Sequence, residues 1–145
     1  MEEFLKATGK LDIILKDSDG NIKQELHVPN LVVTVGKNFI ASRMVGTSSP
    51  VMSHMAIGTN ATAPVSANTT LGTEIARVAL ASATATANTV SYSATFPAGT
   101  GSGAITEAGI FNAASSGTLL CRTTFAVINK AASDVLTINW NVTIN

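Results

Sequence analysis

The middle of this chain contains very few charged side chains. Between Met44 and Cys121 they are Glu74, Arg77 and Glu107, where an ordinary soluble domain would place roughly twenty. The segment is not strongly apolar either, because Ala, Thr, Ser, Asn and Gly fill it. Charge keeps a free monomer soluble, whereas the cores of protein interfaces are depleted of it. The composition therefore indicates a structural protein whose surface is covered by other subunits.

Cysteine, excess basic charge and long apolar runs are scarce as well. Cys121 is the only cysteine, which excludes an internal disulfide and any cysteine-based zinc finger. The net charge is zero, so the chain lacks the basic excess of a dedicated nucleic-acid binder. No apolar run approaches the roughly 18 residues of a membrane-spanning helix, and the first ten residues do not resemble a secretory signal. We therefore expect neither a nucleic-acid nor a membrane partner.

The charges that are present concentrate near the N-terminus. The first 25 residues hold ten of the eighteen charged side chains, so this segment is expected to be solvated and the remainder covered. At 145 residues the chain has the usual length of one domain. No linker or internal repeat divides it, and we expect a single domain over residues 1–145.

Turn and capping signals predict the first elements. Residues 17–20 read Asp-Ser-Asp-Gly, a turn between two alternating runs, so residues 11–28 are expected to form a β-hairpin. The pattern leaves open whether this hairpin joins the main sheet or lies at its periphery. Pro29 and Asn30 are expected to end its second strand. One helix is expected over residues 35–45, with Val35, Phe39, Ile40 and Met44 on one side, Thr34 as its N-cap and Gly46 as its stop.

From residue 53 onward the hydrophobic pattern has a period of two. Residues 90–96 and 134–144 alternate apolar and polar side chains, as half-buried antiparallel strands do. Further strands are expected over residues 53–58, 74–85, 104–112 and 118–128, although residues 74–85 would also suit a helix. Loops are expected at residues 59–72 and 98–103. This pattern predicts a mainly β fold, an antiparallel, jelly-roll-like β-sandwich. An immunoglobulin-like topology is the alternative, but its Cys-Trp-Cys framework is absent.

The residue types that carry catalysis have simpler structural interpretations here. The glycines at 99, 101 and 103 precede a strand, so a flexible connection is expected and not a phosphate-binding loop. His27 and His54 lack the neighbours of a zinc site, and no Gly-x-Ser-x-Gly elbow accompanies the abundant serines. Cys121 follows two leucines and is expected to be a buried thiol. We therefore predict no catalytic, cofactor-binding or metal-binding residue and no enzymatic activity.

Four residues are assigned structural roles. Glu74 and Arg77 stand alone in a charge-poor region and are expected to pair with each other or across a subunit contact, because a covered, unpaired charge is costly. Glu107 is expected to accept hydrogen bonds from a neighbouring loop. Trp140, on the apolar side of the last strand, is expected in the core.

Several stretches, taken together, resemble small structural proteins of tailed bacteriophages. The resemblance runs from about residue 10 to the C-terminus and rests on residues 30–36, 55–64, 70–77 and 94–112, which include Met55-Ala-Ile-Gly-Thr-Asn, Thr70-Leu-Gly-Thr-Glu-Ile-Ala-Arg and Gly103-Ala-Ile-Thr-Glu-Ala-Gly-Ile-Phe-Asn. It implies a jelly-roll-like module without enzymatic activity, a place in the virion after synthesis in the bacterial cytoplasm, and self-association as a dimer or trimer.

Together with the charge depletion, this resemblance leads to the hypothesis of a capsid cement (decoration) protein that binds the outer surface of the major capsid protein. The two uncharged loops are the expected contacts, through Thr59, Ala63, Pro64, Ala67, Leu71, Ala98, Thr100 and Ser102. A tail or fibre-associated subunit is the alternative. A carbohydrate-binding module on the virion surface is a further alternative, and it would require exposed aromatic side chains, Trp140 above all.

Overall fold

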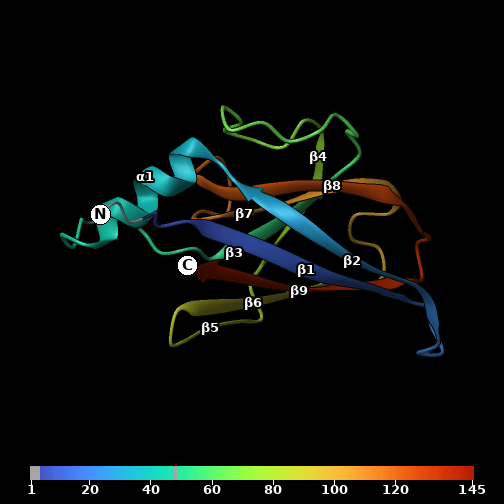
Figure 1. Ribbon diagram of the computed structural model, residues 1–145. Helices are drawn as coiled ribbons and strands as arrows, with labels where there is room; N and C mark the ends of the chain where they lie inside the picture. Colours follow the sequence, from blue (N-terminus) through green and yellow to red (C-terminus); the bar gives the residue numbers. More distant parts are fainter. Residues whose placement is uncertain (1–3, 48) are drawn as a thin grey trace.

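The computed structural model describes residues 4–47 and 49–145 of the chain. In this part of the chain the elements follow in the order β1 (Ala7–Lys16), β2 (Ile22–Val32), α1 (Thr34–Arg43), β3 (His54–Gly58), β4 (Glu74–Ala79), β5 (Ser82–Thr86), β6 (Thr89–Phe96), β7 (Gly103–Phe111), β8 (Leu119–Lys130) and β9 (Val135–Ile144) (Figure 1).

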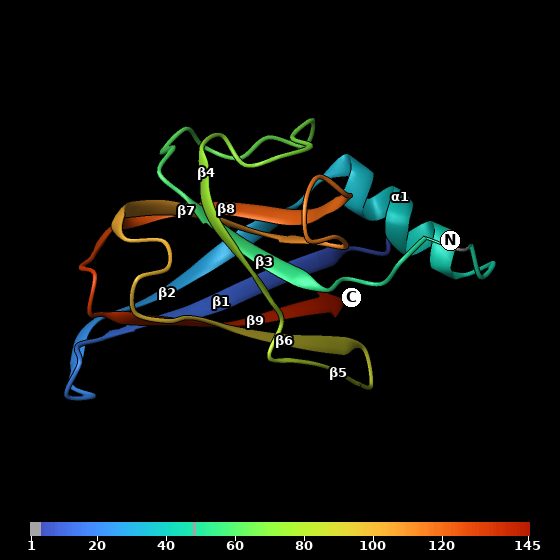
Figure 2. The same ribbon diagram turned by 180° about the vertical axis from the view of Figure 1, so that it is seen from behind.

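The strands form one antiparallel sheet in the order β4-β3-β7-β8-β2-β1-β9-β6-β5. Strand β2 joins its two halves: it pairs with β1 along most of its length, whereas Leu31 and Val32 pair with Arg122 and Cys121 of β8. The sheet curls, so that the halves face each other across one core (Figures 1 and 2). The expected mainly β, sandwich-like fold with a short helix is thereby confirmed. The hairpin of residues 11–28 lies in the middle of the sheet, since β1 pairs with both β2 and β9.

The core follows from the alternation of the strands. Apolar side chains of β1 and β9 point inward and meet those of β3 and β7 from the opposite half; the fully buried members include Leu11, Ile13, Leu15, Met55, Ile57, Ile105, Ile110, Leu136, Ile138 and Trp140. Trp140, with no exposed surface, is in the core as expected. Each such side chain contributes about 1.5–3 kcal/mol by leaving water.

The expected end of β2 at Pro29 is wrong, because the strand continues to Val32. The carbonyl of Pro29 accepts a hydrogen bond from Thr123 Oγ1 of β8 at 2.7 Å, so the backbone of Pro29 faces β8. On that side the ladder begins only at Leu31. Because Pro29 lies outside the β2–β8 ladder, its missing N–H removes no hydrogen bond between these strands, and proline is tolerated at this position.

The helix also differs from its expected capping. Its N-cap is Val33, not Thr34, and no side chain caps it. The N–H of Thr34 instead donates to the carbonyl of Ser66, at 2.8 Å. Met44, expected on the same side of the helix as Val35, Phe39 and Ile40, is 86% exposed. Gly46 has a φ of +67°, in agreement with its expected role as a helix stop.

Residues 74–85 form two strands in place of one. The N–H of Leu80 donates to Ser53, next to β3, whereas the N–H of Ala81 donates to Ser93 of β6. The chain therefore crosses from one half of the sheet to the other between Leu80 and Ala81. Residues 74–85 contain no glycine or proline, so nothing in the sequence indicated that the chain changes partner strands here.

Candidate functional site

The loop of residues 59–73 covers the outer face of strands β3, β7 and β8. Both views place it on this side of the molecule, opposite β5 (Figures 1 and 2). A second apolar cluster lies beneath it, made of Val33, Ala56, Leu71, Phe111 and Leu119. The loop is therefore part of the packed structure and not a free connection, and we call it the outer loop.

A buried ion pair holds the outer loop in place. Arg122 donates from Nε and Nη2 to Glu107 Oε2, at 3.0 and 2.9 Å, and both residues are at most 2% exposed. The carboxylate of Glu107 also accepts the backbone N–H groups of Asn60, Gly72 and Thr73, at 3.3, 2.8 and 2.6 Å. The hydrogen bonds expected from a neighbouring loop to Glu107 are therefore present.

The guanidinium of Arg122 binds the other arm of the same loop. Its Nη2 donates to the carbonyl of Thr62 at 3.0 Å, and its Nη1 donates to Asn68 Oδ1 at 3.2 Å. The sequence reasoning missed Arg122. A signal for it exists, because a hairpin closed at residues 114–117 places Arg122 opposite Gly109, two residues along β7 from Glu107 and on the same face.

Glycine makes the close approach of the outer loop possible. A Cβ at Gly58 would lie 2.3 Å from the carbonyl oxygen of Thr73 and 2.4 Å from Glu107 Oε1. A Cβ at Gly109 would lie 2.8 Å from Leu71 Cδ2. The absence of side chains at Gly58 and Gly109 is thus what allows the loop to rest directly on the sheet.

The structure divides the expected contact residues of the outer loop. Thr59, Ala63 and Ala67 are exposed, and Pro64 is half-buried. Leu71 is 6% exposed and packs on Phe111 and Leu119 in the second cluster. The prediction that Leu71 is an external contact is therefore wrong, because its side chain packs inward and secures the loop to the sheet.

The second expected contact loop, residues 98–103, connects the end of β6 to the start of β7. Ala98 and Ser102 are exposed, and Thr100 is half-buried. Gly101, with a φ of +71°, lies so near that an added Cβ would be 2.6 Å from Ile57 Cδ1. The N–H of Gly99 donates to the carbonyl of Ala132 at 2.7 Å. This loop is consequently fixed at both glycines and not freely flexible.

The expected pair of Glu74 and Arg77 is formed within the chain. Arg77 donates from Nε and Nη2 to the two carboxylate oxygens of Glu74, at 2.9 and 2.7 Å. Its Nη1 donates to the carbonyls of Ala113 and Ser116, and its guanidinium lies 3.8 Å from the ring centroid of Phe111. Arg77 thus joins β4 to the turn between β7 and β8.

A charged cluster stabilises the opposite end of the sheet. Lys23 Nζ lies 2.7 Å from Asp134 Oδ2, and the N–H of Ala131 donates to the same carboxylate at 2.8 Å. These hydrogen bonds hold the pKa of Asp134 below its usual value. Nearby, Lys130 donates to the carbonyl of Pro97 at 3.0 Å, and burial lowers the pKa of its ammonium group.

The remaining titratable residues are dispersed. His27 is exposed beside Asp12, whose hydrogen bond raises the pKa of the imidazole. His54 contacts Ser53 Oγ at 2.8 Å. Cys121 is buried, as expected, and burial raises the pKa of its thiol. Within residues 4–47 and 49–145, no three His, Cys, Asp or Glu side chains gather as metal ligands would. The helix of the described chain is too short and too polar to cross a bilayer.

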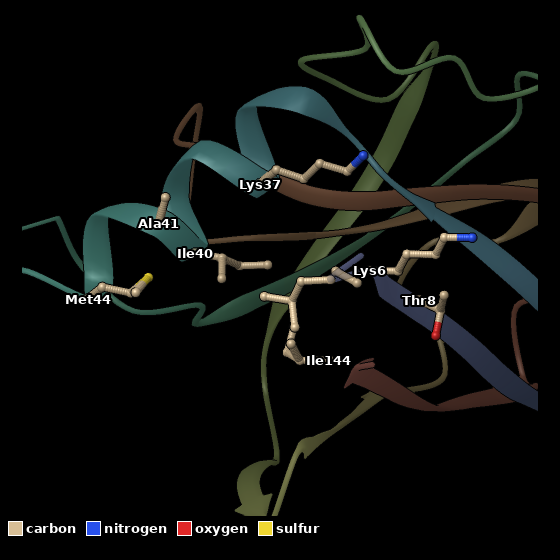
Figure 3. A pocket seen from close by; sticks show the side chains of 9 residues that line it. Lys6, Thr8, Lys37, Ile40, Ala41, Met44 and Ile144 are labelled. Carbon is tan, nitrogen blue, oxygen red and sulfur yellow. The ribbon is translucent and has the colours of Figure 1, made fainter. Parts of the chain in front are cut away.

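An apolar groove of about 450 Å³ lies between α1 and the ends of the terminal strands. Figure 3 shows Ile40 and Met44 of α1 on one side of it and Ile144 on the other, with the ammonium groups of Lys6 and Lys37 toward one end. Phe4, Leu5, Met44 and Val45, all more than three-quarters exposed, belong to the same two segments. The sequence reasoning missed this surface because it grouped Met44 with the other apolar residues on one side of the helix.

Comparison of the chain with protein-family models, with curated proteins and with solved structures finds no match.

Proposed function

We propose that this chain is a structural subunit of a larger assembly, specifically a capsid cement protein of a tailed bacteriophage that binds the outer surface of the major capsid protein. The observation that carries the proposal is the outer loop: an uncharged surface segment held rigid by the buried Glu107–Arg122 pair. A loop that is already ordered loses little conformational entropy when a partner covers it.

The chemistry of the exposed part of the loop supports the same proposal. Thr59, Ala63 and Ala67 are small, uncharged and exposed, which suits a flat contact with little desolvation cost. A cement protein stabilises a shell because it binds the assembled lattice and not the dissociated subunits. The loop of residues 98–103 supplies a second uncharged contact.

Two alternative functions differ from the cement function in measurable ways, one in copy number and one in surface chemistry. A tail or fibre-associated subunit would use the same kind of surface at far lower copy number. A carbohydrate-binding module would present an aromatic platform, and the residue named for that role, Trp140, is fully buried. The cement function is therefore the one that we propose first.

Binding to shells tests the proposed contact. Ala63→Lys combined with Ala67→Lys is expected to abolish co-sedimentation of the protein with capsids that lack it, because two charges would be desolvated in the contact. The control is Ser18→Lys combined with Asn21→Lys, two exposed uncharged residues at the turn between β1 and β2 and in neither proposed contact loop, which is expected to bind as the wild type does. Undiminished binding of the first variant would overturn the proposed contact.

The copy number of the chain in purified virions tests the placement. Quantitative mass spectrometry measures the ratio of this chain to the major capsid protein. We expect a ratio near one, or another simple fraction set by the capsid lattice. A ratio lower by one or two orders of magnitude would move the protein to the tail or fibre, and its absence from virions would overturn the virion assignment.

A further inference from the structure

Strand β5 ends the sheet, and its outer edge has no partner strand in the part of the chain that the structure describes. All its residues are exposed, its register with β6 is regular, and no charged residue occurs from Val78 to Thr106. Natural sheets usually protect such an edge with lysine, proline or a bulge, because its free backbone groups pair readily with another strand. The edge of β5 has none of these protections.

Hydrogen bonds around β6 show which backbone groups of β5 face outward. On one side of β6, the N–H of Ile144 in β9 donates to the carbonyl of Asn88. On the other side, the N–H of Ala81 donates to the carbonyl of Ser93. Since successive residues of a strand direct their backbone groups to opposite sides, odd-numbered residues of β6 face β5. Their partners in β5 are the even-numbered residues. Ala83 and Ala85 therefore direct their N–H and C=O groups to the open edge.

The sequence of β5 is self-complementary. Ser-Ala-Thr-Ala-Thr reads almost alike in both directions from Thr84. In an antiparallel pair about a two-fold axis at Thr84, Ala83 would lie opposite Ala85 of the partner subunit, and each such pair would exchange two hydrogen bonds. Thr84 would lie opposite Thr84 of the partner subunit, a favourable cross-strand pair.

A second copy also continues both faces of the sheet. Ala83 lies opposite Tyr92, and Tyr92 lies opposite the buried Trp140, so the alanines of β5 are on the core side. The hydroxyls of Ser82, Thr84 and Thr86 are consequently on the outer side. The two-fold pairing places alanine beside alanine and hydroxyl beside hydroxyl.

The lack of charge favours a second copy over a different partner. A two-fold axis brings each side chain near its own copy, so any charge at the axis would meet a like charge. Strand β5 avoids that repulsion. A complementary edge in an unrelated protein would impose no such restriction on the sequence of β5.

We propose that β5 is a self-association edge, through which two copies of this chain pair antiparallel about a two-fold axis at Thr84 and form one continuous sheet. The proposal concerns β5 alone and does not rest on the proposed contact of the outer loop with a shell.

Sedimentation equilibrium of the full chain tests this pairing. The wild type is expected to reach twice the chain mass of 14.9 kDa. Thr84→Lys alone and Thr84→Glu alone are each expected to weaken dimerisation by at least about tenfold, because like charges meet at the axis. An equimolar mixture of the two variants is expected to restore the dimer, since Lys then lies opposite Glu. Thr95→Lys, on the same outer face but away from the edge, is the matched control and is expected to dimerise normally.

Ala83→Pro provides a second variant of a different kind. It removes an outward N–H group that the monomer does not use in its ladder, and it is expected to be monomeric and folded by circular dichroism. A wild type that stays monomeric as its concentration is raised would overturn the proposal. So would Thr84→Lys dimerising as tightly as Thr95→Lys, or a Lys and Glu mixture that fails to recover the dimer.

Discussion

Glu107 shows how one buried carboxylate can organise a surface loop. A charge taken out of water is costly unless its partners replace the lost hydration. Glu107 has those partners in Arg122 and in the backbone N–H groups of Gly72 and Thr73. The ordered loop therefore stabilises the buried charge of Glu107, and that charge in turn holds the loop in place.

At the residue scale we expect Glu107→Gln to lower the free energy of unfolding by about 3–5 kcal/mol, because Arg122 would remain buried without its counter-charge. Urea denaturation measures this loss. The control is Asp12→Asn, whose carboxylate binds His27 in a pair with both side chains at least half exposed; it is expected to cost much less, because both groups stay in water. Similar losses in both variants would contradict the role assigned to burial.

Single residues were predictable where the local pattern determines the environment. The alternation around Trp140 was sufficient to place it in the core. The isolation of Glu74 and Arg77 indicated that each needs a partner, but only the structure shows that they pair with each other. The prediction for Leu71 was wrong because the sequence does not distinguish a loop that projects into solvent from a loop that folds back onto a sheet. The turn at residues 114–117 brings Arg122 near Glu107, but two irregularities in the β7–β8 register leave the exact partner to the folded hairpin.

At the scale of elements, strands with strict alternation were predictable and changes of partner were not. The turn at residues 17–20 and the pattern of residues 134–144 determine β1, β2 and β9 locally. The continuation of β2 past Pro29 and the crossing at Leu80 and Ala81 depend on which strand lies alongside. Such partners come from distant parts of the chain, and no local signal specifies them.

The tie between β2 and the turn before β9 gives an element-scale prediction. The hydrogen bond from Lys23 holds the pKa of Asp134 below its value in the unfolded chain. This contribution to stability is present above the unfolded-state pKa and is lost as the pH falls toward the folded-state pKa. We expect Asp134→Asn to be less stable at neutral pH and to lose less of its unfolding free energy between about pH 5 and pH 2.

Urea midpoints at a series of pH values measure this difference. Asp19→Asn, in the exposed turn between β1 and β2, serves as the control and is expected to follow the wild-type pH dependence. If the curves of Asp134→Asn and the wild type ran parallel down to pH 2, the contribution of the Lys23–Asp134 pair would be refuted.

At the scale of the whole molecule, the two halves of the sheet share one core, although the β2–β8 ladder that joins them is short. Only Leu31 and Val32 of β2 pair with β8. The main cluster nevertheless includes side chains of β1, β6 and β9 together with side chains of β3, β7 and β8. Because neither half can keep its apolar face from water alone, the halves should unfold together.

The chain carries a natural probe in each half that tests this cooperativity. Trp140 is the only tryptophan and lies in β9, whereas Cys121 is the only cysteine and lies in β8; both are fully buried. We expect tryptophan fluorescence and pulsed thiol labelling to give the same urea midpoint, because opening either half exposes the shared core. Labelling of Cys121 at a lower urea concentration than the fluorescence change would show that the β3-β4-β7-β8 half opens first, and the molecule would then not be one cooperative unit.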